Sequence, residues 1–144
     1  MNFGLNNLSI NSTSHRFTQM NTKNFIEKEL SYQIIGCAME VYNTLGYGFL
    51  EKIYENALMV SFAENNIKAE KQKPISVLYH EKIIGDYFTD IIIENKIILE
   101  LKTIEQIRQE HRAQLLNYLK ATNIELGFLL NFGKKKLEYE RFVY

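Results

Sequence analysis

The stretch TDIIIENKIILELK, from Thr89 to Lys102, constrains the fold of this chain more than any other segment. Two runs rich in isoleucine and leucine flank Glu94–Lys96, and this composition is typical of two antiparallel strands joined by a tight loop. Asp90, Glu100 and Lys102 interrupt the apolar runs. Two carboxylates and an ammonium therefore stand in segments whose other residues are those of a buried sheet.

Strand geometry decides whether these three side chains meet. Residues two apart point to the same side of a sheet, so Glu100 and Lys102 share a face. Opposed residues of an antiparallel hairpin have a constant number sum, and Asp90 joins that face only if the sum is even, for example with Asp90 opposite Glu100. This register requires an odd-length loop such as Glu94–Lys96, in which Asn95 is at ease in the left-handed conformation. A two-residue turn would place Asp90 on the opposite face.

In that register, two carboxylates would converge with one lysine. Like charges held close in a partly apolar setting repel, and a bound hard cation relieves the repulsion; oxygen ligands of this kind suit Mg²⁺ or Mn²⁺. The lysine could orient or deprotonate an attacking water, or stabilise negative charge on a phosphate. The combination predicts a phosphodiester hydrolase. The alternative is an ordinary solvated strand face on which Glu and Lys alternate.

The rest of the sequence indicates the layers around this strand pair. Apolar residues at helical spacing predict helices over about 25–45 and 49–64, with glycines at the end of the first. Three or four antiparallel strands are expected over 67–103, then a helix over about 104–121, a buried strand in ELGFLLNFG and a final strand in LEYERFVY. The order α-α-β-β-β-α-β-β predicts an α/β (α+β) fold with a mixed central β-sheet flanked by helices.

The helical period also predicts which side chains of the first two helices are buried and which are exposed to solvent. Cys37 falls on the apolar stripe of the first helix and is expected to be buried. Glu51 lies close to the apolar stripe of the second helix, whereas Glu55 and Glu64 are expected to be solvated. The side chains expected on the buried side of the second helix are Leu50, Ile53, Tyr54, Ala57, Leu58, Ser61 and Phe62.

Residues 1–23 differ in composition from the remainder. They are rich in Asn, Ser and Thr, and their few apolar residues follow neither helical nor strand spacing, which predicts a disordered polar tail. A single domain is expected over 24–144. Met20 stands just before the first periodic segment, so translation beginning there is an alternative hypothesis.

Charge and cysteine content exclude several classes of protein. Lys+Arg and Asp+Glu both total 17, so a surface that binds nucleic acid must be a local basic patch. The single cysteine forbids an intramolecular disulfide and a multi-cysteine zinc site, and favours a reducing compartment. No apolar run approaches the ~20 residues that span a bilayer, and the N-terminus lacks the pattern of a signal peptide. We expect a soluble cytoplasmic protein that does not associate with membranes.

Two further motifs make the chain similar to a known family. GYGFLEKIYENAL contains Gly48-x-x-Glu51-x-x-Tyr54, the signature of the GxxExxY proteins, a bacterial and archaeal group in the PD-(D/E)XK nuclease superfamily. QLLNY, with Gln114 and Tyr118, matches the Q-x-x-x-Y motif of its RecB-like and lambda-exonuclease-like branch. The resemblance covers about 25–144 and implies a restriction-endonuclease-like core: a helix, a three-stranded meander bearing D…(D/E)-x-K, a further helix and another strand.

The resemblance also implies catalytic roles. Asp90 and Glu100 match the metal-binding acids, and Glu51 matches an acid on the first core helix that reaches the same metal directly or through water. Lys102 matches the catalytic lysine. Gln114 is implied to act with it from the third helix. The implied activity is that of an Mg²⁺-dependent (or Mn²⁺-dependent) nuclease that hydrolyses nucleic acid, with DNA as the expected substrate.

Substrate-binding residues are expected around this centre. Tyr118 lies four residues after Gln114, on the same helix face, where the two could position a phosphate or orient the lysine. Tyr54 is a candidate substrate contact; the alternative is a core aromatic whose hydroxyl is bonded at the edge of the site. Arg112 is the third candidate, within a local basic patch of Arg108, Arg112, Lys120 and Lys134–Lys136.

A second class of function stays open at this stage. The same fold could serve as a non-catalytic module that binds nucleic acid or a protein partner, and homo-oligomer formation is compatible with either class. Binding of Mn²⁺ that depends on Asp90 would distinguish the nuclease from the module.

Overall fold

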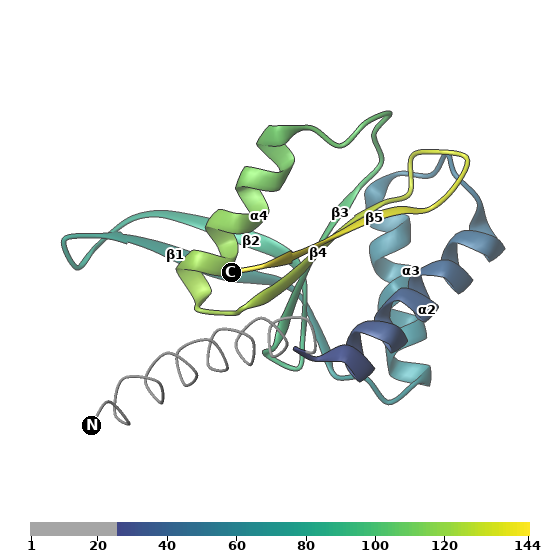
Figure 1. Ribbon diagram of the computed structural model, residues 1–144, viewed down its shortest axis with the longest axis horizontal. Helices are drawn as coiled ribbons and strands as arrows, with labels where there is room; N and C mark the ends of the chain where they lie inside the picture. Colours follow the sequence, from purple (N-terminus) through teal and green to yellow (C-terminus); the bar gives the residue numbers. More distant parts are fainter. Residues whose placement is uncertain (1–25) are drawn as a thin grey trace, which may run out of the picture.

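Residues 26–144, which the computed structural model describes, form a five-stranded sheet with helices on both faces (Figure 1). The strands lie side by side in sequence order, and β3 and β4 are parallel whereas the other neighbours are antiparallel. The strands are β1 (Ala69–Tyr79), β2 (Lys82–Ile93), β3 (Ile97–Lys102), β4 (Leu126–Asn131) and β5 (Glu138–Val143). The predicted fold class and element order are confirmed. The predicted tail over 1–23 lies outside the described residues.

Three helices complete the described part of the chain: α2 (Lys28–Leu45), α3 (Glu51–Glu64) and α4 (Gln109–Thr122). Because two parallel strands need a crossover, α4 connects β3 to β4. It begins at Gln109, five residues later than predicted, because both backbone groups of Ile104 are bonded to the Asn131 side chain. No helix among residues 26–144 is long and apolar enough to cross a membrane.

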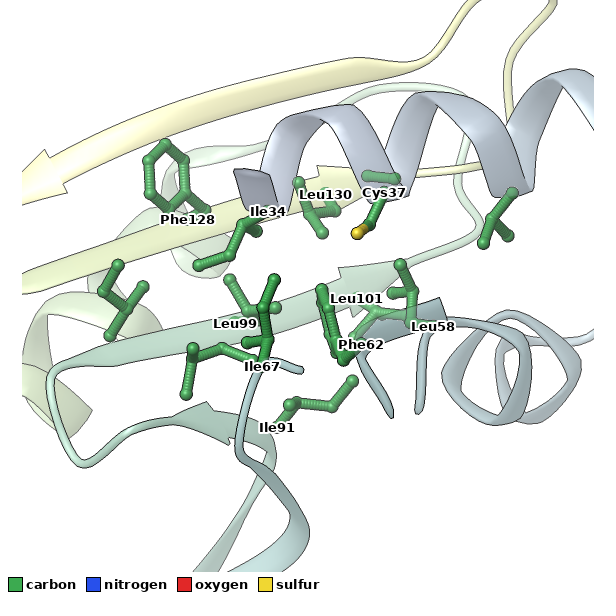
Figure 2. Close-up of a cluster of buried hydrophobic side chains, with 14 of the residues drawn as sticks. Ile34, Cys37, Leu58, Phe62, Ile67, Ile91, Leu99, Leu101, Phe128 and Leu130 are labelled. Carbon is green, nitrogen blue, oxygen red and sulfur yellow. The ribbon is translucent and has the colours of Figure 1, made fainter. Parts of the chain in front are cut away.

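The sheet separates two apolar layers. Ile97, Leu99 and Leu101 of β3 point toward α2 and α3, whereas Ile98 between them points toward α4, as the two-residue period of a strand requires. Figure 2 shows the larger layer, in which Cys37 is buried as predicted. Side chains labelled there with it are Ile34, Leu58, Phe62, Ile67, Ile91, Leu99, Leu101, Phe128 and Leu130.

The buried face of α3 differs from the predicted one. Leu50 and Ile53 are 78% and 43% exposed, because Leu50 is extended backbone before the helix and Ile53 is in its first turn. Glu55 is buried instead, contrary to the expected solvated charge, because α3 packs against β1 and Gln72 of that strand donates to its carboxylate. The contact face of α3 is therefore rotated toward β1.

The loop between β2 and β3 has the odd length that is required for Asp90 to share a face with Glu100. Ile91 pairs with Leu99 and Ile93 with Ile97, which leaves Glu94, Asn95 and Lys96 as the loop. Glu94 and Asn95 have φ values of 51° and 57°, in the left-handed region that this type of loop uses. A two-residue turn is excluded, and continuation of the register sets the next β2 residue, Asp90, opposite Glu100.

Candidate active site

Asp90 and Glu100 meet where β2 and β3 separate. The backbone N–H of Asp90 donates to Glu100 Oε1 at 3.3 Å, and the backbone N–H of Leu101 donates to Asp90 Oδ2 at 2.7 Å. Each carboxylate therefore bonds a main-chain N–H of the opposite strand. Glu100 is only 4% exposed and Asp90 is partly buried, so both acids are held in place away from bulk water.

Burial, and after it the negative charge of Asp90, raise the pKa of Glu100 to about 9, against the opposing effects of the Asp90 backbone N–H and of Lys102. Burial also raises the pKa of Asp90, although the hydrogen bond from Leu101 opposes this. The two side chains are hydrogen-bonded to each other. At neutral pH the pair therefore holds a proton that a cation could replace.

Lys102 belongs to a chain of polar groups that ends on α4. Its Nζ donates to Gln114 Oε1 at 3.5 Å, and Gln114 Nε2 donates to the Tyr118 hydroxyl at 2.9 Å. Burial raises the pKa of Tyr118, and the charge of Glu100 adds to the effect, which places this phenol in the same electrostatic neighbourhood. The amide of Gln114 thus holds the ammonium beside the two acids.

Glu51 approaches the same place from the first turn of α3. The backbone N–H of Thr103 donates to its carboxylate, and partial burial, followed by the charge of Asp90, raises its pKa. Glu55, one turn later, is an acid that the sequence analysis missed: its charge raises the pKa of both Glu51 and Asp90. Its spacing of four residues from Glu51, which puts both on one helix face, was the available signal.

The donor chemistry of this cluster fits a hard divalent cation. Asp90 and Glu100 offer oxygen ligands only, and their shared proton marks an excess of negative charge that a cation would compensate. Within residues 26–144, no group of three or more His, Cys, Asp or Glu side chains is arranged to hold a metal ion. Mg²⁺ does not need such a group, since it keeps several waters and binds one or two carboxylates together with substrate phosphates.

The model of the PD-(D/E)XK nuclease superfamily matches residues 28–142. The chain belongs to the PD-(D/E)XK nuclease superfamily. Among solved structures, the one titled "Crystal structure of SSO0001" is similar over 84% of this chain, with a TM-score of 0.52 and 20% sequence identity. This chain spans 60% of that one, and the similarity supports the fold alone. None of the curated proteins matches the chain.

Asn131 holds the end of β3 in this superfamily member and was not identified from the sequence. Its Oδ1 accepts hydrogen bonds from the N–H groups of Ile104 and Gly133, at 3.1 and 3.0 Å, and its Nδ2 donates to the Ile104 carbonyl at 2.9 Å. The Phe132 N–H donates to the Lys102 carbonyl at 2.8 Å. The available sequence signal was a polar residue at the end of an apolar strand, and the structure shows that this residue is fully buried.

The structure shows the surroundings of two residues that were predicted to contact the substrate. Tyr54 is fully buried; its hydroxyl donates to the Gly46 carbonyl at 2.6 Å and its ring stacks on Phe132, so it is the core aromatic of the alternative interpretation. Arg112 forms two 2.7 Å hydrogen bonds to Glu140 through its Nε and Nη2, so a carboxylate of β5 engages that edge of the guanidinium.

The predicted basic patch is also partly neutralised. Besides Arg112, Lys134 is paired, with its Nζ 2.8 Å from Glu138 Oε2. Arg108 is the N-cap of α4, where its backbone N–H donates to His111 Nδ1 at 2.9 Å. The rest of the predicted patch consists of Arg108, Lys120, Lys135 and Lys136.

Proposed function

We propose that this chain is an Mg²⁺-dependent nuclease that hydrolyses phosphodiester bonds of nucleic acid, with DNA as the expected substrate. The observation that carries the proposal is the buried, hydrogen-bonded pair of Asp90 and Glu100 beside Lys102, in a member of a nuclease superfamily. The finer assignment to the GxxExxY proteins and the RecB-like branch rests on the motifs at Gly48–Tyr54 and Gln114–Tyr118. We place its action in the cytoplasm.

In this proposal, Asp90 and Glu100 would hold Mg²⁺ or Mn²⁺, with Glu51 contributing directly or through water. When bound, the metal would polarise a phosphate oxygen and acidify a water. Lys102, oriented by Gln114, orients the attacking water and stabilises the negative charge that develops on the phosphate. Tyr118 holds the Gln114 amide and so keeps the ammonium in place.

Alanine at Glu100 or at Lys102 should abolish Mg²⁺-dependent cleavage of labelled oligonucleotides, with a loss of about 10²-fold or more because each removes a group acting at the reacting phosphate. Glu64→Gln and Lys68→Ala are matched controls, since both residues are exposed and away from the site. Circular dichroism should show that all four variants are folded. Cleavage that persists in both Glu100→Ala and Lys102→Ala would contradict the proposal.

Calorimetric titration with Mn²⁺ separates the nuclease from a non-catalytic module. Because Asp90 is proposed to be a ligand, Asp90→Ala should weaken the binding that the unmodified protein shows. The Glu64→Gln variant should bind Mn²⁺ as the unmodified protein does. Binding that is unchanged in Asp90→Ala, or no binding at all, would favour the module.

A further inference from the structure

A groove of about 910 Å³ lies between α4 and the β1–β2 arm, the part of that hairpin over residues 76–88. In Figure 1 this arm extends beyond the other strands, next to α4. The arm contributes Ser76, Val77, Leu78 and Tyr87 to the groove, and α4 contributes the opposite wall. The volume is within the range of about 300–1,000 Å³ usual for ligand pockets, which is ample for a nucleotide.

The groove is continuous with the proposed catalytic centre. Gln114 and Tyr118 line it, and the same two side chains form the hydrogen-bond chain that holds Lys102. A molecule in the groove therefore touches the residues that position the ammonium. This continuity favours the substrate strand itself as the occupant.

Tyr87 is the aromatic residue of the arm that faces the groove. Its ring lies 5.8 Å from that of Tyr118, at an interplanar angle of 51°, and the residue is 51% exposed. A tilted pair leaves part of the Tyr87 face uncovered. Such an exposed phenol face is a stacking surface for a nucleobase, whichever base it is.

Polar residues of the groove could bind the base edge and the phosphate of a nucleotide. Ser76 and Asn117 offer hydroxyl and amide groups to a base edge, and Lys120 offers a positive charge to a phosphate. His111 Nδ1 accepts the Arg108 N–H at 2.9 Å, so a neutral ring carries its proton on Nε2 and can donate it. The lining therefore provides hydrogen bonds around an apolar stacking face.

We propose that this groove binds an unpaired nucleobase of the substrate strand, stacked on Tyr87 beside Tyr118. Except at the terminal pair of a duplex, both faces of a paired base are covered by its neighbours, so stacking of an internal base on a side chain requires that the base leave the helical stack. The substrate class is thus single-stranded nucleic acid or an unpaired strand end. This inference rests on the proposed nuclease function and adds to it the class of strand.

The test uses short single-stranded oligonucleotides, one DNA and one RNA, each with a single 2-aminopurine whose fluorescence falls when the base stacks on an aromatic ring. Binding is measured with Mg²⁺ on the Lys102→Ala background, and blunt duplexes of the same sequences are the comparison. Tyr87→Ala should weaken single-strand binding about 10- to 100-fold and abolish the quenching. Tyr87→Phe keeps the aromatic ring, so it should retain both the single-strand binding and the fluorescence quenching.

Tyr79→Ala is the matched control, because Tyr79 is also an exposed tyrosine of the same hairpin, stacks on His80 and does not line the groove. It should bind and quench as the background protein does. Single-strand binding and quenching that are unchanged in Tyr87→Ala would overturn the groove proposal and leave the nuclease proposal standing. If the protein binds none of the four nucleic acids, the groove proposal and the nuclease proposal are both overturned. Comparison of the DNA and RNA oligonucleotides identifies the sugar preference.

Discussion

Glu100 lies in β3 between isoleucine and leucine side chains, at a position where an aliphatic residue would pack without cost. A buried carboxyl next to a second acid is unfavourable unless a proton or a cation is bound between them. Two backbone N–H groups and Lys102 compensate part of this cost. Residues of this kind are expected where function, and not stability, determines the side chain.

The raised pKa of Glu100 makes metal-free stability pH-dependent. The unfolded carboxyl titrates near its ordinary value of 4.5 and the folded one near about 9. Below 4.5 both states are protonated; between these values only the unfolded state loses the proton, so the free energy of unfolding falls as pH rises to about 9. Glu100→Gln removes this pH-dependent loss of stability, because the amide does not titrate, and its N–H group can donate to Asp90 at every pH. The substitution should therefore stabilise the metal-free protein by on the order of 1–3 kcal/mol above neutral pH.

Thermal unfolding in EDTA across this pH range measures the effect, with Glu64→Gln as a solvated control. Added Mg²⁺ should raise the Tm of the unmodified protein, because the metal binds only the folded state, and should raise that of Glu100→Gln less. A metal-free Glu100→Gln protein that is less stable than the unmodified one at alkaline pH would contradict this interpretation.

At the scale of the element, the β2–β3 hairpin depends on its three-residue loop. Asn95 has a φ of 57°, which a β-branched residue tolerates poorly and glycine adopts freely. Asn95→Val should lower the free energy of unfolding by about 1–2 kcal/mol, whereas Asn95→Gly should change it little. Urea denaturation measures both, and equal stability of the two variants would show that the loop does not hold this conformation in solution.

At the scale of the whole molecule, the segments after β3 and after β4 cross at Gly133. A Cβ atom added there would lie 2.4 Å from the Ile104 backbone nitrogen and 2.6 Å from the Thr103 carbonyl carbon, distances that require the backbone to move. Gly133→Ala should therefore lower the free energy of unfolding by about 1–3 kcal/mol and reduce cleavage, because Thr103 directly follows Lys102.

Gly36 of α2 is the comparison for this substitution. A Cβ added there would have no atom within 4 Å apart from its chain neighbours and the backbone of its own helix, so Gly36→Ala should stabilise the protein by about 0.5–1 kcal/mol through helix propensity. Urea denaturation of both variants measures the change in the free energy of unfolding, which should be negative for Gly133→Ala and positive for Gly36→Ala. A stabilising Gly133→Ala would mean that the crossing is looser than the structure describes.

Local features of this protein could be predicted from its sequence. The element order followed from hydrophobic period, and the alternation of side chains along a strand gave the condition for the β2–β3 register, which is an odd-length loop. That register alone was enough to bring Asp90 and Glu100 together. The two-residue period of a strand also set Lys102 on the face of Glu100, whereas Glu51 and Gln114 were indicated by resemblance to a family.

Only the tertiary structure decided contacts between residues far apart in the chain. Glu55 became part of the acidic cluster because α3 packs against β1, and Asn131 joined the end of β3 because β4 lies beside it. Arg112 was engaged by Glu140 of β5, and Tyr87 was set against α4. Periodicity tells which face of an element is buried, but the partner of each polar group depends on how the elements pack, and that is a property of the whole fold.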